Sequence, residues 1–219
     1  MTAVLTLALE AATSTGSVAV LRGDELLASR EVAMRSGAEE HLLPAIDESL
    51  REAGVTTRDL ARLVCGAGPG SFTSLRVSAS LAKGIAFAHR LPLYAVPSLA
   101  LIAADASLPD GAYLAVLDAL RGDVFAGAYM REGNAVTELA PLRLLPRDTL
   151  AQEAALLHAT IIGPEERPRT TPRAANVMRL GTWLALPPVP LAAWEPDYGR
   201  LAEAQVKWEQ AHGRPLPVA

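Results

Sequence analysis

Two acidic residues, Glu10 and Asp118, each follow a predicted strand, one in each half of the chain. In two-lobed phosphotransferase folds, acids at such strand ends line the nucleotide cleft between the lobes. Thr13 and Gly163 would complete a cleft of this kind. Acids next to turns more often make local hydrogen bonds to backbone N–H groups. We therefore favour local hydrogen bonding and keep a vestigial nucleotide cleft at these four positions as an alternative.

A glycine-rich segment at residues 66–76 separates a short apolar run from a long run of small apolar residues. This order predicts a strand, a tight turn and a helix, and glycines let a second backbone or an anion approach closely. A phosphate loop would need a lysine directly after Gly70, and a dinucleotide fingerprint would need a glycine at position 71. The residue order also differs from that of a serine-hydrolase elbow. We interpret the turn as a packing corner whose residues are Gly68, Pro69, Gly70, Ser71, Phe72 and Thr73.

The helix predicted at residues 73–89 is rich in small residues, which allow a second helix to approach closely. It has few polar residues on any face, and such a helix is expected to be buried all round. Helical phase alone does not separate internal packing from packing against a partner, but burial all round favours a partner. With the helix predicted at residues 38–53, it would form a two-helix patch. The predicted partner-contact residues are Leu42, Ile46, Val77, Ser80, Leu81 and Gly84.

Metal and nucleophile chemistry has little support in the sequence. The four histidines form no i, i+4 ligand pair, and none neighbours a cysteine. The glutamates before His41 are typical of a charged first helical turn. Cys65, the single cysteine, ends a predicted buried strand and fits a core position in a reducing compartment. We predict no catalytic residue, no metal and no cofactor.

The bulk properties describe a globular chain without a strong preference for nucleic acid. Of its 219 residues, 50% are hydrophobic and 5% aromatic, and its net charge of −4 disfavours direct nucleic-acid binding. One basic cluster, at residues 167–173, is predicted to be a solvated loop, because three arginines bind phosphates weakly. The N-terminus lacks the features of a signal peptide, and no apolar run reaches the ~18 residues of a membrane span. We expect a cytoplasmic protein.

The periodicity predicts a mixed α/β fold in two parts. The first part, residues 1–107, has the order strand-strand-strand-helix-strand-helix-strand-helix. A boundary at residues 108–111 starts a smaller second part, residues 108–219, whose order also begins with strands but shows no clear sequence repeat. Its predicted elements are strands at 113–118, 124–130, 136–139, 143–145 and 160–162, and helices at 149–157, 174–186 and 201–211.

Several of these segments together resemble one known family. Residues 68–76 (GPGSFTSLR) are similar to the GPGSFTGLR signature of the TsaB (YeaZ) proteins. Residues 9–13 resemble the end of their first strand, and residues 41–46 resemble their first helix. Residues 118–121 are similar to a "DAR" segment, and residues 195–200 to a C-terminal "EPxYLR". The resemblance covers most of the chain in the same order.

This resemblance implies an actin-like, hsp70-like (ASKHA, ribonuclease H-like) fold with a reduced second lobe. It also implies a role in synthesis of N6-threonylcarbamoyladenosine at position 37 of tRNA. There the family acts as a required but non-catalytic partner of TsaD, the metal- and nucleotide-binding paralogue, and a small ATPase, TsaE, joins them. The helix patch would bind TsaD, or a second copy when TsaD is absent. Contact with tRNA would be indirect, through the complex.

The sequence departs from the family pattern at four positions, which are Glu10, Ser74, Leu120 and Gly199. Glu10 replaces an aspartate and weakens the nucleotide-cleft interpretation, and Ser74 is expected to widen the helix contact slightly. Two other functions stay open: an ATP-dependent kinase-like enzyme of the same superfamily, and a peptidase, since these proteins are grouped with glycoproteases. The peptidase has no metal-ligand pair or placed nucleophile to support it.

Overall fold

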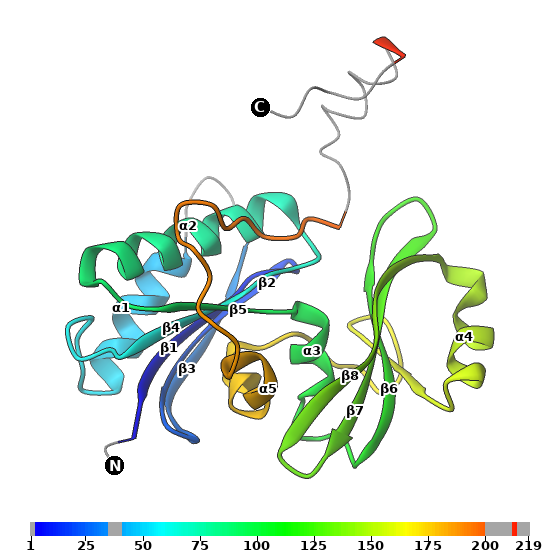
Figure 1. The fold of residues 1–219 in the computed structure, drawn as a ribbon, viewed down its shortest axis with the longest axis horizontal. Helices are drawn as coiled ribbons and strands as arrows, with labels where there is room; N and C mark the ends of the chain where they lie inside the picture. Colours follow the sequence, from blue (N-terminus) through cyan, green and yellow to red (C-terminus); the bar gives the residue numbers. More distant parts are fainter. Residues whose placement is uncertain (1–2, 35–40, 200–211, 214–219) are drawn as a thin grey trace.

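The computed structural model describes residues 3–34, 41–199 and 212–213, and its first half is built on a five-stranded sheet (Figure 1). Strand order is β3-β2-β1-β4-β5, with the first three strands antiparallel and the last two parallel to β1. The strands are β1 (Leu5–Glu10), β2 (Thr15–Arg22), β3 (Glu25–Ala33), β4 (Arg62–Gly66) and β5 (Leu93–Val96).

Helices cover both faces of this sheet. Helices α1 (Leu42–Glu52) and α2 (Phe72–His89) lie side by side on one face, and α3 (Ser98–Ala103) lies on the other (Figure 1). Alternation along β1 explains the division, since Leu7 and Leu9 face α1 and α2, whereas Ala8 faces α3. All six residues of α3 are buried, and its cluster includes side chains from both halves of the chain.

The second sheet repeats the topology of the first with one strand fewer. Its order is β8-β7-β6-β9, with antiparallel β6–β7 and β7–β8 pairs and a parallel β6–β9 pair. Helix α4 (Leu150–Leu156), entered through the 3-10 turn η1 (Arg147–Thr149), stands where α1 stands in the first sheet. No fifth strand joins β9 in the described residues. The strands are β6 (Gly111–Asp118), β7 (Asp123–Glu132), β8 (Ala135–Pro146) and β9 (Thr160–Ile162).

Several predicted elements differ from the observed ones. The strands predicted at 136–139 and 143–145 are one edge strand, β8, which tolerates Pro141 because an edge strand does not need every N–H group. The helix predicted at 174–186 is a 3-10 turn, η2 (Ala174–Arg179), and one helical turn, α5 (Gly181–Leu184), separated at Leu180 by a ψ of 39°. The helix predicted at 201–211 lies outside the described residues, as do residues 38–40 of the first predicted helix.

The chain passes from the first sheet to the second after α3. Because α3 packs on β6 and β7 as well as on the first sheet, one apolar cluster contains side chains of both sheets, and each sheet has a further cluster of its own. The division into residues 1–107 and 108–219 stays a prediction. Among the described residues, no helix has both the length and the apolar character needed to cross a membrane.

Candidate functional site

The glycine turn between β4 and α2 is packed against backbone on both sides. A Cβ atom at Gly68, whose φ is +89°, would lie 2.1 Å from the carbonyl oxygen of Asp197. A Cβ atom at Gly70 would lie 2.2 Å from the carbonyl oxygen of Ala12. Such distances are impossible for a side chain, so the glycines are required by packing of the chain on itself. These backbone segments occupy the space next to both glycines.

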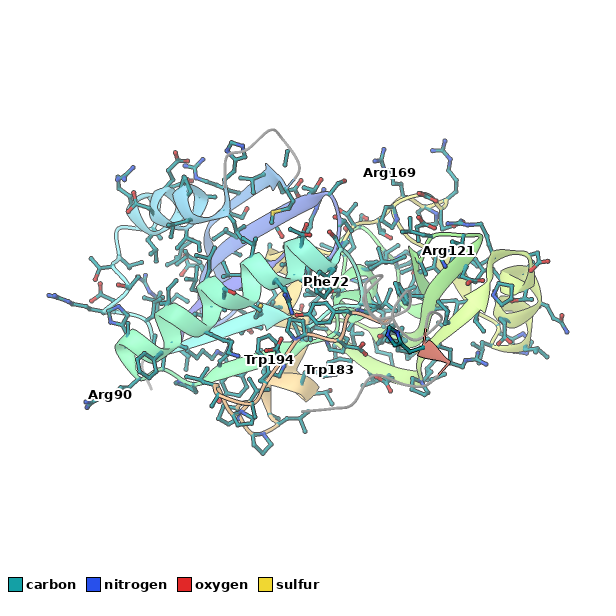
Figure 2. All side chains as sticks on the ribbon, turned by 90° about the horizontal axis from the view of Figure 1, so that it is seen from above. Phe72, Arg90, Arg121, Arg169, Trp183 and Trp194 are labelled. Atoms are coloured by element: carbon teal, nitrogen blue, oxygen red, sulfur yellow. The ribbon has the colours of Figure 1, made fainter. Side chains whose placement is uncertain are left out.

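A strap formed by residues 187–199 holds the outer side of this turn. It is anchored where Val189 N–H donates to the Leu93 carbonyl oxygen at 2.8 Å, and where Asp197 N–H donates to the Ala67 carbonyl oxygen at 2.7 Å. Between these anchors, Lys83 Nζ on α2 donates to the Trp194 carbonyl oxygen at 2.9 Å. Figure 2 shows Trp194 along one flank of α2. The strap therefore covers one flank of α2 and leaves its outer face open.

The carboxyl group of Glu10 lies beneath the turn and is fully buried. Its Oε1 accepts the Ala12 N–H at 2.5 Å, and its Oε2 accepts the Ser98 hydroxyl at 2.9 Å. A Cβ atom at Gly66 would lie 1.7 Å from Oε2, so this glycine makes room for the longer acid. Burial raises the pKa of Glu10 from 4.5 to about 7, although the hydrogen bonds from Ala12 and Ser98 act in the opposite direction.

Ser98 makes its side-chain hydrogen bonds beneath the glycine turn and does not cap α3. Pro97 occupies the N-cap position of α3, and Ser98 is the first helical residue. Its hydroxyl donates to Glu10 and accepts the Gly68 N–H at 3.2 Å. The serine thus links β1, the glycine turn and α3. Beside Glu10, burial raises the pKa of the Cys65 thiol to about 12, which agrees with a core role.

The other candidate cleft residues make local contacts. The Thr13 hydroxyl donates to the Thr15 carbonyl oxygen at 2.9 Å, and Asp118 Oδ1 accepts the Leu120 N–H at 3.1 Å. Gly163 packs on β6, because a Cβ atom there would lie 2.5 Å from the Val116 carbonyl oxygen. The vestigial nucleotide cleft at these positions stays a prediction, and the carboxyl group of Glu10 has no solvent exposure. No group of three potential metal ligands occurs among the described residues.

Helix α2 has one buried face, which contradicts the expectation of burial all round. Its outer face is open: Phe87 is 79% exposed, and a Cβ atom at Gly84 would meet nothing within 4 Å. Ser74 is buried and its hydroxyl donates to Ser71 Oγ at 3.0 Å, so it does not widen the outer contact as expected. The face that packs on the chain's own sheet consists of Ser74, Leu75, Ser78, Ala79, Ala82 and Ala86.

The predicted contact residues divide between the surface and the core. Ser80 and Gly84 are exposed, and Val77 and Leu81 are half-buried. Leu42 and Ile46 are 0% and 3% exposed within the chain's own core, so as they stand they cannot contact a partner. The apolar stripe of α1 is the face that its own sheet buries, and helical phase alone does not show whether the sheet or a partner covers it. On the outer side of α1, the predictions missed Leu43, which is 51% exposed.

An aromatic cluster at the start of α2 was also missed. The rings of Phe72 and Tyr198 lie 4.5 Å apart, and the Arg76 guanidinium lies 4.4 Å from the Phe72 ring centroid. Arg76 Nε donates to the Tyr198 hydroxyl oxygen at 3.3 Å. Next to this cluster, a Cβ atom at Gly199 would lie 2.3 Å from Phe125, so no side chain fits there. The cluster joins the glycine-rich motif at residues 68–76 to the C-terminal motif at residues 195–200 on one surface, where Figure 2 labels Phe72.

Two sheets of the same strand order, the second one reduced, define the class of the protein: an actin-like (ASKHA, ribonuclease H-like) two-lobe fold. The structure of YeaZ from Pseudomonas aeruginosa has a TM-score of 0.76 to this chain at 26% identity, covering 89% of this chain and 99% of that one. A structure titled as an uncharacterized protein with similarity to peptidase YeaZ from P. aeruginosa has a TM-score of 0.77 at 27% identity, covering 90% and 100%.

The sequence comparisons agree with this class. A family model described as TsaD, tRNA N6-adenosine threonylcarbamoyltransferase, matches residues 31–163, more than half of the chain. The tRNA threonylcarbamoyladenosine biosynthesis protein TsaB of Bacillus subtilis is 28% identical, with 92% of this chain and 96% of that protein aligned. An uncharacterized protein of Mycobacterium tuberculosis is 32% identical, with 90% and 94% aligned. The chain belongs to the TsaB (YeaZ) family.

Proposed function

We propose that the chain serves tRNA threonylcarbamoyladenosine synthesis as the non-catalytic partner of a TsaD-like transferase. The family membership supports the pathway, because the B. subtilis relative is named for this biosynthesis. The open outer face of α2 is the observation that supports the partner role. A TsaE-like ATPase would join the pair, and tRNA would be reached through the complex. The setting would be the cytoplasm.

The outer face of α2 has the chemistry of a helix-docking surface. Gly84 and Ser80 lie one turn apart and leave the backbone accessible, so a partner helix could approach to the short end of the ~8–10 Å range. Phe87 lies on this side at the C-terminal end, and burying such a ring contributes about 1.5–3 kcal/mol. Leu43 of α1 adds a second exposed apolar side chain. A second copy of the chain could use the same surface when the transferase is absent.

The substitution Gly84→Arg tests this proposal. Its side chain would project from the open side of α2, so we expect normal folding but at least about tenfold weaker binding to the TsaD-like protein. Modification of tRNA by the reconstituted complex should fall in parallel. Gly181→Arg is the matched control, because Gly181 also has no atom within 4 Å of its Cβ position and lies in α5. Unchanged binding of a folded Gly84→Arg variant would refute the docking surface.

The kinase-like alternative makes a different prediction. An ATP-dependent enzyme would bind Mg-ATP in the isolated chain and turn it over, which calorimetry and a phosphate-release assay detect. The burial of Glu10 argues against it, because the acid expected to face the nucleotide is 0% exposed.

A further inference from the structure

A pocket of about 310 Å³ lies between the first sheet and α5, on the face of the sheet opposite to α1 and α2 (Figure 1). Its sheet side includes Thr6 and Arg62, which are register partners at the beginning of the parallel β1–β4 pair. The glycine turn follows the other end of β4 and contributes no residue to the pocket. The volume is at the lower end of the ~300–1,000 Å³ range of small-molecule sites, so it indicates a small ligand.

Arg62 places a positive charge in this pocket. Its Nε donates to Thr6 Oγ1 at 2.9 Å, and its guanidinium carbon lies 5.9 Å from the centroid of the Tyr94 ring. The side chain is half-buried, yet it forms no ion pair with an acidic residue in the described part of the chain. The N–H groups on its two terminal nitrogens are therefore available for the paired hydrogen bonds by which a guanidinium binds a carboxylate.

Asp24, in the turn between β2 and β3, places a negative charge in the same pocket. Its side chain is exposed, and it has neither a hydrogen bond nor an ion pair with any described residue. No nitrogen of Arg62 lies within 4.0 Å of its carboxylate oxygens. Because the two charges do not pair directly, a ligand that carries both a carboxylate and an ammonium group could bind each of them.

Most other side chains that line the pocket are apolar. Leu21 of β2 and Val177 of η2 are buried, and Met178 of η2 and Leu184 of α5 are half-buried. Small-molecule sites commonly combine such an apolar lining with a few polar groups that fix the orientation of the ligand. This lining fits a hydrocarbon side chain.

We propose that the pocket binds a free α-amino acid with an apolar side chain. Its carboxylate would bind the Arg62 guanidinium, its ammonium group would bind Asp24, and its side chain would contact Val177, Met178 and Leu184. A free amino acid is a small molecule that carries all three groups within a few bonds of one another. No residue of α2 lines the pocket, so this proposal does not depend on the docking surface proposed above.

The test uses L-leucine and two analogues that each lack one charged group, with ligand-observed NMR on the full chain. The analogue without the amine is 4-methylpentanoate, and the analogue without the carboxylate is 3-methylbutylamine. We expect leucine to bind about three- to fivefold more tightly than 4-methylpentanoate, because an exposed charge pair such as that with Asp24 is weak. We expect 3-methylbutylamine to bind at least about tenfold more weakly than leucine.

Two variants assign these differences to the two charged residues. Arg62→Gln should weaken the binding of leucine and of 4-methylpentanoate at least about tenfold. Asp24→Asn, an exposed substitution that leaves the core intact, should remove the preference for leucine over 4-methylpentanoate. Arg22→Gln is the control, because Arg22 is exposed on β2 and does not line the pocket, and it should bind all three compounds like the wild type.

Several results would overturn the proposal. Leucine could give no binding signal with the wild type. Leucine and 4-methylpentanoate could bind equally well, which would mean that the pocket does not recognise an ammonium group. Folded Arg62→Gln and Asp24→Asn proteins could bind leucine as the wild type does, which would place the amino acid at another site.

Discussion

The buried carboxyl group of Glu10 should make the stability of the protein depend on pH. Its pKa rises from 4.5 to about 7 on folding, mainly because burial disfavours the charged form. A raised folded-state pKa means that the folded protein retains this proton to higher pH than the unfolded chain does. The stabilising contribution is therefore complete below pH 4.5, declines as pH rises through 7, and is absent above that.

The magnitude follows from the shift of about 2.5 pH units. At ~1.36 kcal/mol per unit, the free energy of unfolding should decrease by about 3 kcal/mol from this group between pH 4.5 and pH 8. Glu10→Gln removes the titration, and its amide oxygen can still accept the Ala12 N–H. The difference in free energy of unfolding between the variant and the wild type should therefore change by about 3 kcal/mol in favour of the variant as the pH rises from 4.5 to 8.

Urea denaturation of both proteins at four pH values between 4.5 and 8 measures this difference. Glu132→Gln, a substitution of the same type at an exposed position, is the control and should follow the wild-type curve. Parallel curves for the wild type and Glu10→Gln would refute the reasoning, because they would mean that Glu10 binds the same number of protons folded and unfolded.

Two further predictions concern the same network. Ser98→Ala removes a hydrogen bond that lowers the pKa of Glu10, so that pKa should rise further in the variant. The decrease in the free energy of unfolding with rising pH should then begin at the same pH, extend to higher pH and be larger. Denaturation curves unchanged from the wild type would contradict this. Gly66→Ala places a methyl group against Glu10 Oε2 and should lower the free energy of unfolding by about 1–3 kcal/mol at pH 5, measured by denaturation. Gly181→Ala, at a position with no neighbour within 4 Å of its Cβ and no left-handed φ, is the control for the general cost of replacing glycine. An equal loss in both variants would contradict the prediction.

Local patterns predicted the order of elements in the first sheet. Alternating apolar residues and turn signals identified the strands of β1 to β5, and the glycines at 66–70 identified the strand, turn and helix that follow. The resemblance of residues 68–76 to one family also predicted the fold class, which the comparisons confirm. These features can be recognised from residues close together in the sequence, by a short hydrophobic period or by a local motif.

Other properties depend on contacts between distant residues and could not be predicted in this way. Helical phase groups Leu42 with Ile46, but only the packed sheet shows that this stripe faces inward. The burial of Glu10 depends on Ser98, and the second sheet repeats the first through strand pairing without a visible sequence repeat. The sequence by itself thus determined which elements form and which family they belong to. Only the tertiary structure decided which faces remain open, because solvent exposure is set by the packing of segments far apart along the chain.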